Sequence, residues 1–184
     1  HRPALDRKRV ALERVAAKTG KRLVTLATNF RDTRVSLRPN AWGPIVHGPA
    51  VVASGLLLGL RWRTLLISAS FGYDELDPWG SHALSDPLLS TSATRVRHYG
   101  ADASSDRLEK TAFLSRFDVA LNHLHVCWQD FSDSNCGLCE KCFRTLLALE
   151  LAGARDRAAS FPRGTFSLDR LRDVWTDKPL VVRV

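Results

Sequence analysis

The stretch VCWQDFSDSNCGLCEKCFRT, from Val126 to Thr145, holds every cysteine of this 184-residue chain. The thiols lie at Cys127, Cys136, Cys139 and Cys142, so the spacing is x8-x2-x2. Tight Cys-x2-Cys turns can supply two or three ligands to a tetrahedral ion, and Cys127 can fold back as the remaining ligand. Gly137 suits such a turn, because backbone amides that point at sulfur often need a residue without Cβ. The spacing therefore predicts a metal centre.

Three interpretations of this cluster remain open. Structural zinc is favoured, because all-cysteine zinc sites are closed and redox-silent. An iron–sulfur cluster is the second, since Cys-x2-Cys-x2-Cys is also the ferredoxin triad. That triad normally continues to a fourth cysteine and a proline, whereas Cys142 is followed by FRTLLALELAGA. Disulfides are the third, although nothing else in the chain indicates a secreted, disulfide-rich domain.

The composition is that of a globular protein, with 45% hydrophobic and 25% charged residues. The longest apolar stretch, Ile45 to Leu60, is too short and too interrupted by glycine, proline and histidine to span a bilayer. The N-terminus lacks the basic-then-apolar order of a secretory signal. Reduced thiols and these features lead us to expect a cytoplasmic protein without membrane contact.

The charge balance is basic, with a formal net charge of +8. This excess indicates an anionic partner such as nucleotide phosphates, an acidic metabolite or RNA. Because the arginines are spread along the chain, ordinary solubility explains the charge equally well. The chain contains no methionine and begins at His1, so we expect a further N-terminal section upstream.

Hydrophobic patterning predicts a parallel α/β unit. Two apolar runs, Arg22–Thr28 and Thr64–Ser70, are rich in strand formers, and an apolar helix lies between them from about Pro49 to Leu58. Strand, helix and strand in this order are typical of a parallel crossover. Ligands of open parallel sheets bind beyond the carboxyl ends of the strands, and both ends here lead into polar segments.

The remaining elements are predicted from periodicity and from capping residues. They are a helix at Leu5–Lys18 stopped by Gly20, a long connection at Tyr73–Ser104, a helix at Asp106–Arg116 capped by Asp106, a third strand at His123–Trp128, a helix from Glu140 stopped by Gly153, a short helix at Leu168–Trp175, and a strand at Lys178–Val184.

Taken together, these motifs resemble those of the adenine nucleotide alpha hydrolase (PP-loop ATP pyrophosphatase) proteins, most closely the 7-cyano-7-deazaguanine synthases. The residues behind the resemblance are Cys127 with Asn135–Cys142, then Arg144, preceded by Gly80–Thr91 and by the helix holding Arg107–Thr111. The resemblance implies a Rossmann-like (HUP-type) parallel sheet that is incomplete at the N-terminus. It implies part of a nucleotide-binding α/β domain at residues 1–120 and a helical zinc-binding lobe at residues 121–184.

The chain departs from the family in one respect. The Ser-Gly-Gly-x-Asp-Ser loop that cradles ATP phosphates is absent from it, and the nearest candidate, Ala53–Leu56, lies inside an apolar helix. We expect the first strand and its phosphate loop to lie upstream.

The resemblance implies an ATP-dependent ligase or synthase that adenylates a carboxylate or carbonyl oxygen and releases pyrophosphate, with zinc, ATP and Mg²⁺ as cofactors. No catalytic residue is identified. The candidates for contacts with phosphates or substrate are Arg31, Arg107, Lys110, His82, Asp86 and Ser90. Ordinary surface charge and loop capping are the alternative roles for these residues.

Two rival functions remain open: a zinc-stabilised nucleic-acid-binding module, and a non-catalytic PP-loop-like subunit. The expected partners are a small anionic or nucleobase-like substrate, nucleic acid in the first rival case, and a second copy or another subunit.

Overall fold

The computed structural model describes residues 2–58, 62–73, 76–100, 107–129 and 134–172. The chain divides into two compact units, of which one is Leu26–Asp106 and the other joins His1–Thr25 to Arg107–Val184. The predicted boundary between a nucleotide-binding domain and a zinc lobe at residue 120 stays a prediction. Among the described residues the fold is mixed, with helices and a small parallel sheet.

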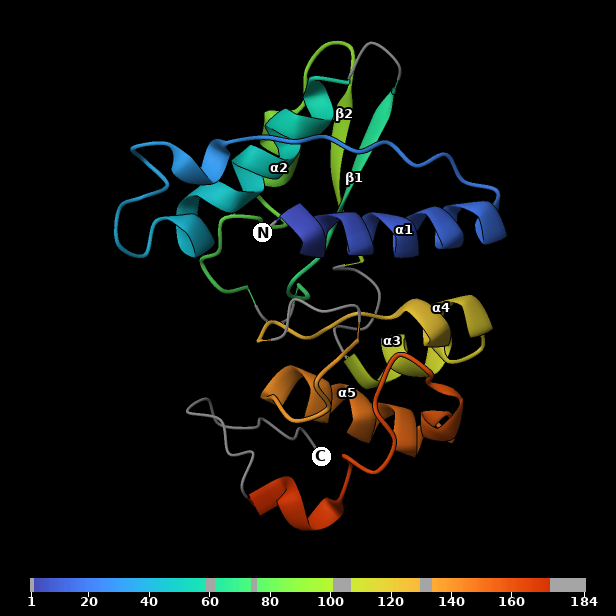
Figure 1. Cartoon of the computed structure of the whole chain (residues 1–184). Coiled ribbons are helices and arrows are strands. Elements are labelled where there is room, and N and C mark those ends of the chain that lie inside the picture. The colour runs from blue at the N-terminus through green and yellow to red at the C-terminus, as the bar shows by residue number, and fades with distance from the viewer. Residues whose placement is uncertain (1, 59–61, 74–75, 101–106, 130–133, 173–184) are drawn as a thin grey trace. The chain divides into compact units, whose positions relative to one another are not determined.

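The unit Leu26–Asp106 is built on two parallel strands, β1 (Thr64–Ser68) and β2 (Arg95–Tyr99), which lie side by side in Figure 1. Thr64 pairs with Arg95, and Ser68 pairs with Tyr99. The α2 helix (His47–Leu56) follows a π-helical turn, Trp42–Val46, and contacts β1. Two short 3-10 helices, η1 (Phe30–Asp32) and η4 (Asp86–Leu89), complete the unit, and η4 contacts β2.

A small apolar core joins α2 to the strands. It consists of Val52 from α2, Ile67 from β1 and Val96 from β2. Because side chains alternate along a strand, His98 lies on the same face of β2 as Val96. That face of the strand is the one that carries the core.

One predicted strand and one predicted connection need correction. The strand predicted at Thr64–Ser70 is confirmed as β1, which ends at Ser68. Arg22–Thr28 forms no strand, and Val24 and Leu26 are 41% and 45% exposed. The parallel partner of β1 is β2, which lies inside the predicted connection Tyr73–Ser104. The prediction was wrong because an apolar run without a hydrogen-bonding neighbour gains nothing from the extended form.

The other unit is helical and is organised around α5 (Glu140–Leu151). Its further elements are α1 (Arg2–Thr19), α3 (Arg107–Leu114), α4 (Asp118–His123) and the 3-10 helices η5 (Arg155–Arg157) and η6 (Leu168–Arg172). Within it, α1 contacts α4 and α3 contacts α5. Its core comprises Leu121, Cys127, Cys139, Cys142, Leu146, Leu149, Ala154, Ala158 and Phe161.

The predicted helix stops are confirmed in this unit. Gly20 and Gly153 have φ values of +65° and +64°, the left-handed conformation that ends helices at glycine. The backbone amide of Ala154 then donates to the carbonyl of Leu149 at 2.8 Å. This bond satisfies a carbonyl that the end of α5 would otherwise leave without a hydrogen-bond donor.

The predicted strand at His123–Trp128 is wrong, because α4 ends at His123 and no strand follows it up to Trp128. The chain instead leads into the cysteine loop, where the Asn135 side chain forms hydrogen bonds with the backbone groups that a neighbouring strand would otherwise pair. The helix predicted at Asp106–Arg116 is confirmed as α3, whereas its cap Asp106 lies outside the described residues. The final helix is described only as η6, and Lys178–Val184 lies outside the described residues.

Candidate metal centre

The four cysteine sulfurs converge on one point of the helical unit. All Sγ atoms lie within 4.8 Å of one another. Cys127 Sγ is 3.9 Å from Cys139 Sγ, and Cys136 Sγ is 3.8 Å from Cys142 Sγ. A tetrahedral ion with metal–sulfur bonds of about 2.3 Å places its ligands about 3.8 Å apart. The four thiols are not bridged into disulfides. Their arrangement is therefore suited to a single metal ion.

Each ligand comes from a different part of the local chain. Cys127 follows α4, Cys136 opens the turn that Gly137 continues, Cys139 is the N-cap residue of α5, and Cys142 lies in the first turn of α5. A metal bound here would join the segment after α4 to the start of α5.

Burial separates the ligands from water. Cys142 is 0% exposed, and Cys127 and Cys139 are buried, whereas Cys136 is half-buried. Burial raises the pKa of the Cys142 thiol, and the adjacent thiols of Cys139 and Cys136 add to the rise. The backbone amide of Gly137 opposes it. Since a thiolate in such a place needs a cation nearby, a bound metal would supply the compensating charge.

The turn around Gly137 directs amides at sulfur, as the sequence predicted. The backbone amides of Leu138 and Cys139 lie 3.4 and 3.3 Å from Cys136 Sγ. Gly137 has a φ of +71°, and a Cβ built on it would lie 2.8 Å from Thr165 Cβ. Glycine is therefore needed at this position both for the backbone conformation and for the close approach of Thr165.

We expect Gly137→Ala to lower the free energy of unfolding by about 2–4 kcal/mol, because a left-handed alanine and an overpacked contact each add a cost. Gly164→Ala is the matched control, since Gly164 has a φ of +76° but nothing within 4 Å of the added Cβ. That variant should lose only about 1–2 kcal/mol. Denaturant unfolding measures both. Equal losses would show that the contact with Thr165 has no energetic weight.

Asn135 lies in the cysteine motif but was not among the site residues predicted from the sequence. Its side chain is 0% exposed. Its Oδ1 accepts hydrogen bonds from the amides of Val126 and Cys127 at 2.8 and 3.1 Å. Its Nδ2 donates to the carbonyls of Leu124 and Ser160 at 2.8 and 3.0 Å. One amide side chain thus holds the backbone that presents Cys127.

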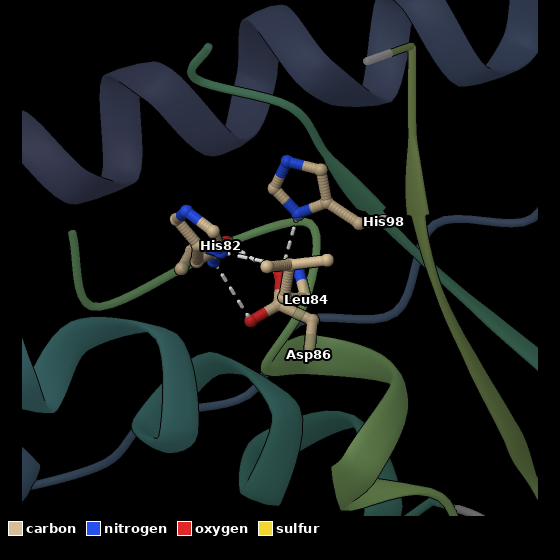
Figure 2. Close-up of polar contacts among 5 residues, drawn as sticks. His82, Leu84, Asp86 and His98 are labelled. Atoms are coloured by element: carbon tan, nitrogen blue, oxygen red, sulfur yellow. Dashed lines mark hydrogen bonds and ion pairs between the residues drawn. The ribbon is translucent and has the colours of Figure 1, made fainter. Parts of the chain in front are cut away.

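His82 and Asp86, two of the predicted substrate contacts, come together in the unit Leu26–Asp106 (Figure 2). Asp86 is 0% exposed, and its Oδ1 accepts from the His82 amide at 3.2 Å. Its Oδ2 accepts from Ser81 Oγ and from His98 Nδ1, each at 2.7 Å. His98 lies within the predicted connection Tyr73–Ser104 and was not among the predicted site residues, because no sequence signal links it to Asp86.

The remaining candidates have local contacts. Ser90 Oγ donates to the Pro87 carbonyl at 2.6 Å and accepts from the Val96 amide at 3.0 Å, so it joins η4 to β2. The Arg31 guanidinium lies 4.8 Å from the centre of the Trp42 ring.

Arg107 and Lys110 both lie in α3, in the helical unit. The Arg107 carbonyl accepts a hydrogen bond from Thr111 Oγ1 at 2.8 Å. The roles of these two residues, and of the other candidates, as ligand contacts stay predictions.

Comparison with known proteins found no matching family model, no matching curated protein and no matching solved structure. Within the described part of the chain, the helices are all too short or too polar to cross a membrane.

Proposed function

We propose that Cys127, Cys136, Cys139 and Cys142 bind one zinc ion as a closed structural centre. The observation that carries this proposal is the convergence of the four sulfurs within 4.8 Å of one another. The distances support one ion over an iron–sulfur cluster, because the thiolates of a cluster bind different iron atoms and therefore lie farther apart. With all four ligands supplied by the protein, the ion has no open position for substrate, so its role is structural.

The centre would stabilise the helical unit by closing a loop. Cys127 and Cys139 belong to the same buried core as Leu146 and Leu149 of α5. A zinc ion holds the loop onto that core where apolar burial alone is limited by the small size of the unit. Its binding energy then contributes directly to the stability of the unit.

Metal analysis of the purified protein tests this proposal. We expect one zinc per chain and no visible absorbance. If the protein contains iron and inorganic sulfide and is brown, the centre is an iron–sulfur cluster and not a zinc site. If it is metal-free and its folding is unchanged, the proposal of a metal centre is refuted.

A second candidate function is the ATP-dependent activation of a carboxylate or carbonyl by adenylation, in the manner of the PP-loop proteins. It is supported by the resemblance of the cysteine motif and by the parallel pair β1–β2, whose carboxyl ends are the usual place for a ligand. The net charge of +8 is compatible with the phosphates of ATP, which this proposal pairs with Mg²⁺ and an anionic or nucleobase-like substrate. A larger Rossmann-like sheet and a cytoplasmic location belong to this proposal.

The formation of AMP and pyrophosphate from ATP and Mg²⁺, with a panel of small carboxylates and ammonia, tests the second candidate. We expect AMP to form only when a carboxylate is present. Salt-dependent binding of tRNA or duplex DNA without any AMP formation would favour the nucleic-acid-binding module instead. The absence of both activities would favour a non-catalytic subunit.

A further inference from the structure

The network around Asp86 contains a histidine nitrogen placed for chemistry. Asp86 is fully buried, and its carboxylate receives hydrogen bonds from Ser81 Oγ, the His82 amide and His98 Nδ1. These three bonds fix the position of the carboxylate, and the carboxylate in turn holds His98 from one side.

This contact determines which ring nitrogen of His98 is available. Because Asp86 accepts the bond at 2.7 Å, Nδ1 carries the hydrogen, and Nε2 of the neutral ring carries the lone pair. The His98 side chain is only 3% exposed, and the described residues give Nε2 no hydrogen bond. Nε2 is not among the fully buried unpaired atoms of the described chain, so it is the ring nitrogen that a small ligand can reach.

The position of His98 in the sheet suits a ligand. It is the last residue but one of β2, and it pairs in register with Ile67 near the carboxyl end of β1. Ligands of parallel sheets bind beyond such ends. Figure 2 shows the His82 and His98 rings above Asp86, with Nε2 of His98 directed away from the carboxylate.

The arrangement differs from that of a serine hydrolase. There the serine hydroxyl bonds to the free nitrogen of the histidine, whereas Ser81 Oγ donates to the Asp86 carboxylate. Ser81 and Asp86 both lie on the Nδ1 side of the ring. Asp86 is therefore a positioning residue, and Ser81 supports Asp86.

From these observations we infer that His98 Nε2 is a general base that accepts a proton from a substrate amine or hydroxyl bound at the carboxyl end of β2. The N–H or O–H bond breaks, its electron pair stays on the nitrogen or oxygen as the nucleophile, and the proton forms a bond with Nε2. The imidazolium so formed is stabilised by the Asp86 carboxylate and later releases its proton to water or to a leaving group.

This inference deepens the proposed adenylation, because the displacement of AMP by ammonia or an amine requires a proton acceptor, and it rests on that function for its substrate. The geometry of His98 stands without it. The test of His98 therefore uses neither ATP nor substrate. A negative result for His98 can then be told apart from a negative result in the adenylation assay.

Two measurements on the full chain test the inference. Long-range ¹H–¹⁵N correlation spectra of the imidazole rings report which nitrogen of His98 carries the hydrogen. Diethyl pyrocarbonate reports access, since an unprotonated nitrogen attacks one of its carbonyl carbons and takes an ethoxycarbonyl group, while ethyl carbonate leaves and breaks down to ethanol and carbon dioxide. We expect the wild-type ring to carry hydrogen on Nδ1 and to be modified at Nε2.

The variants separate positioning from folding. In Asp86→Asn we expect the preference for the Nδ1 hydrogen to be lost and the modification rate of His98 to fall by at least about tenfold. Ser81→Ala is the matched control, because it removes one donor from the same carboxylate and leaves the bond to His98. It should retain the wild-type tautomer and reactivity. If Asp86→Asn does not fold, the wild-type and Ser81→Ala measurements still decide. Hydrogen on Nε2 of the wild-type ring, or a ring closed to the reagent, overturns the inference.

Discussion

Removal of the metal is expected to unfold the helical unit around α5, and Cys139→Ser is expected to behave like the chelated protein. Structural zinc contributes about 10–16 kcal/mol in zinc-finger peptides at neutral pH. Whole domains are stable by only about 5–15 kcal/mol. Without the ion, the buried sulfurs of Cys127, Cys139 and Cys142 lose the bonds that hold the loop to α5. Near-ultraviolet circular dichroism and thermal unfolding, with and without a chelator, measure the loss.

The control must separate ligand loss from disturbance of the core. Ala158→Ser places the same hydroxyl group in the same core cluster at a position that is 5% exposed, and it removes no ligand. It should cost about 1–3 kcal/mol and keep one zinc per chain. Addition of zinc should restore the chelated wild-type protein but not Cys139→Ser. A Cys139→Ser protein with full metal content and an unchanged melting temperature would refute the structural role.

The cysteine centre could be predicted from the sequence because its information is local. The short spacing of Cys136, Cys139 and Cys142 keeps their thiols close together, and thiolates bind a limited set of metal ions. Helix ends at Gly20 and Gly153 are equally local, since each depends on one residue that accepts a positive φ. The apolar run of β1 was identified for a similar reason, although its partner was not.

The rest depends on contacts between distant residues. The segment RVRHY of β2 has a single aliphatic side chain, Val96, within a polar stretch, so only its pairing with β1 shows that it is a strand. Arg22–Thr28 is the opposite case, an apolar run with no strand beside it. The bond between Asp86 and His98 spans 12 positions, and that between Asn135 and Ser160 spans 25. No periodicity within one element encodes such pairs.

We expect Asn135→Ala to destabilise the helical unit and to lower its affinity for zinc. The substitution leaves the amides of Val126 and Cys127 and the carbonyl of Leu124 without the side chain that now pairs them, whereas the Ser160 carbonyl keeps the bond from the backbone amide of residue 135. Each buried polar group left unpaired costs about 1–3 kcal/mol, so we expect a loss of several kcal/mol. Because the Cys127 amide is one of these groups, the first ligand would also lose its fixed position.

Two further variants identify the cause. Asn135→Asp keeps the acceptor oxygen toward Val126 and Cys127 but turns a second oxygen toward the carbonyls of Leu124 and Ser160, so it should be about as damaging as Asn135→Ala. Ser160→Ala removes only the hydroxyl that donates to Leu121, at 3.0 Å, and should cost about 1 kcal/mol. Competition for zinc against a chromophoric chelator should show that affinity falls about 10–100-fold in both Asn135 variants and stays unchanged in Ser160→Ala. Wild-type zinc affinity in Asn135→Ala would mean that the cysteine ligands are positioned without this amide, and that its hydrogen bonds serve the fold alone.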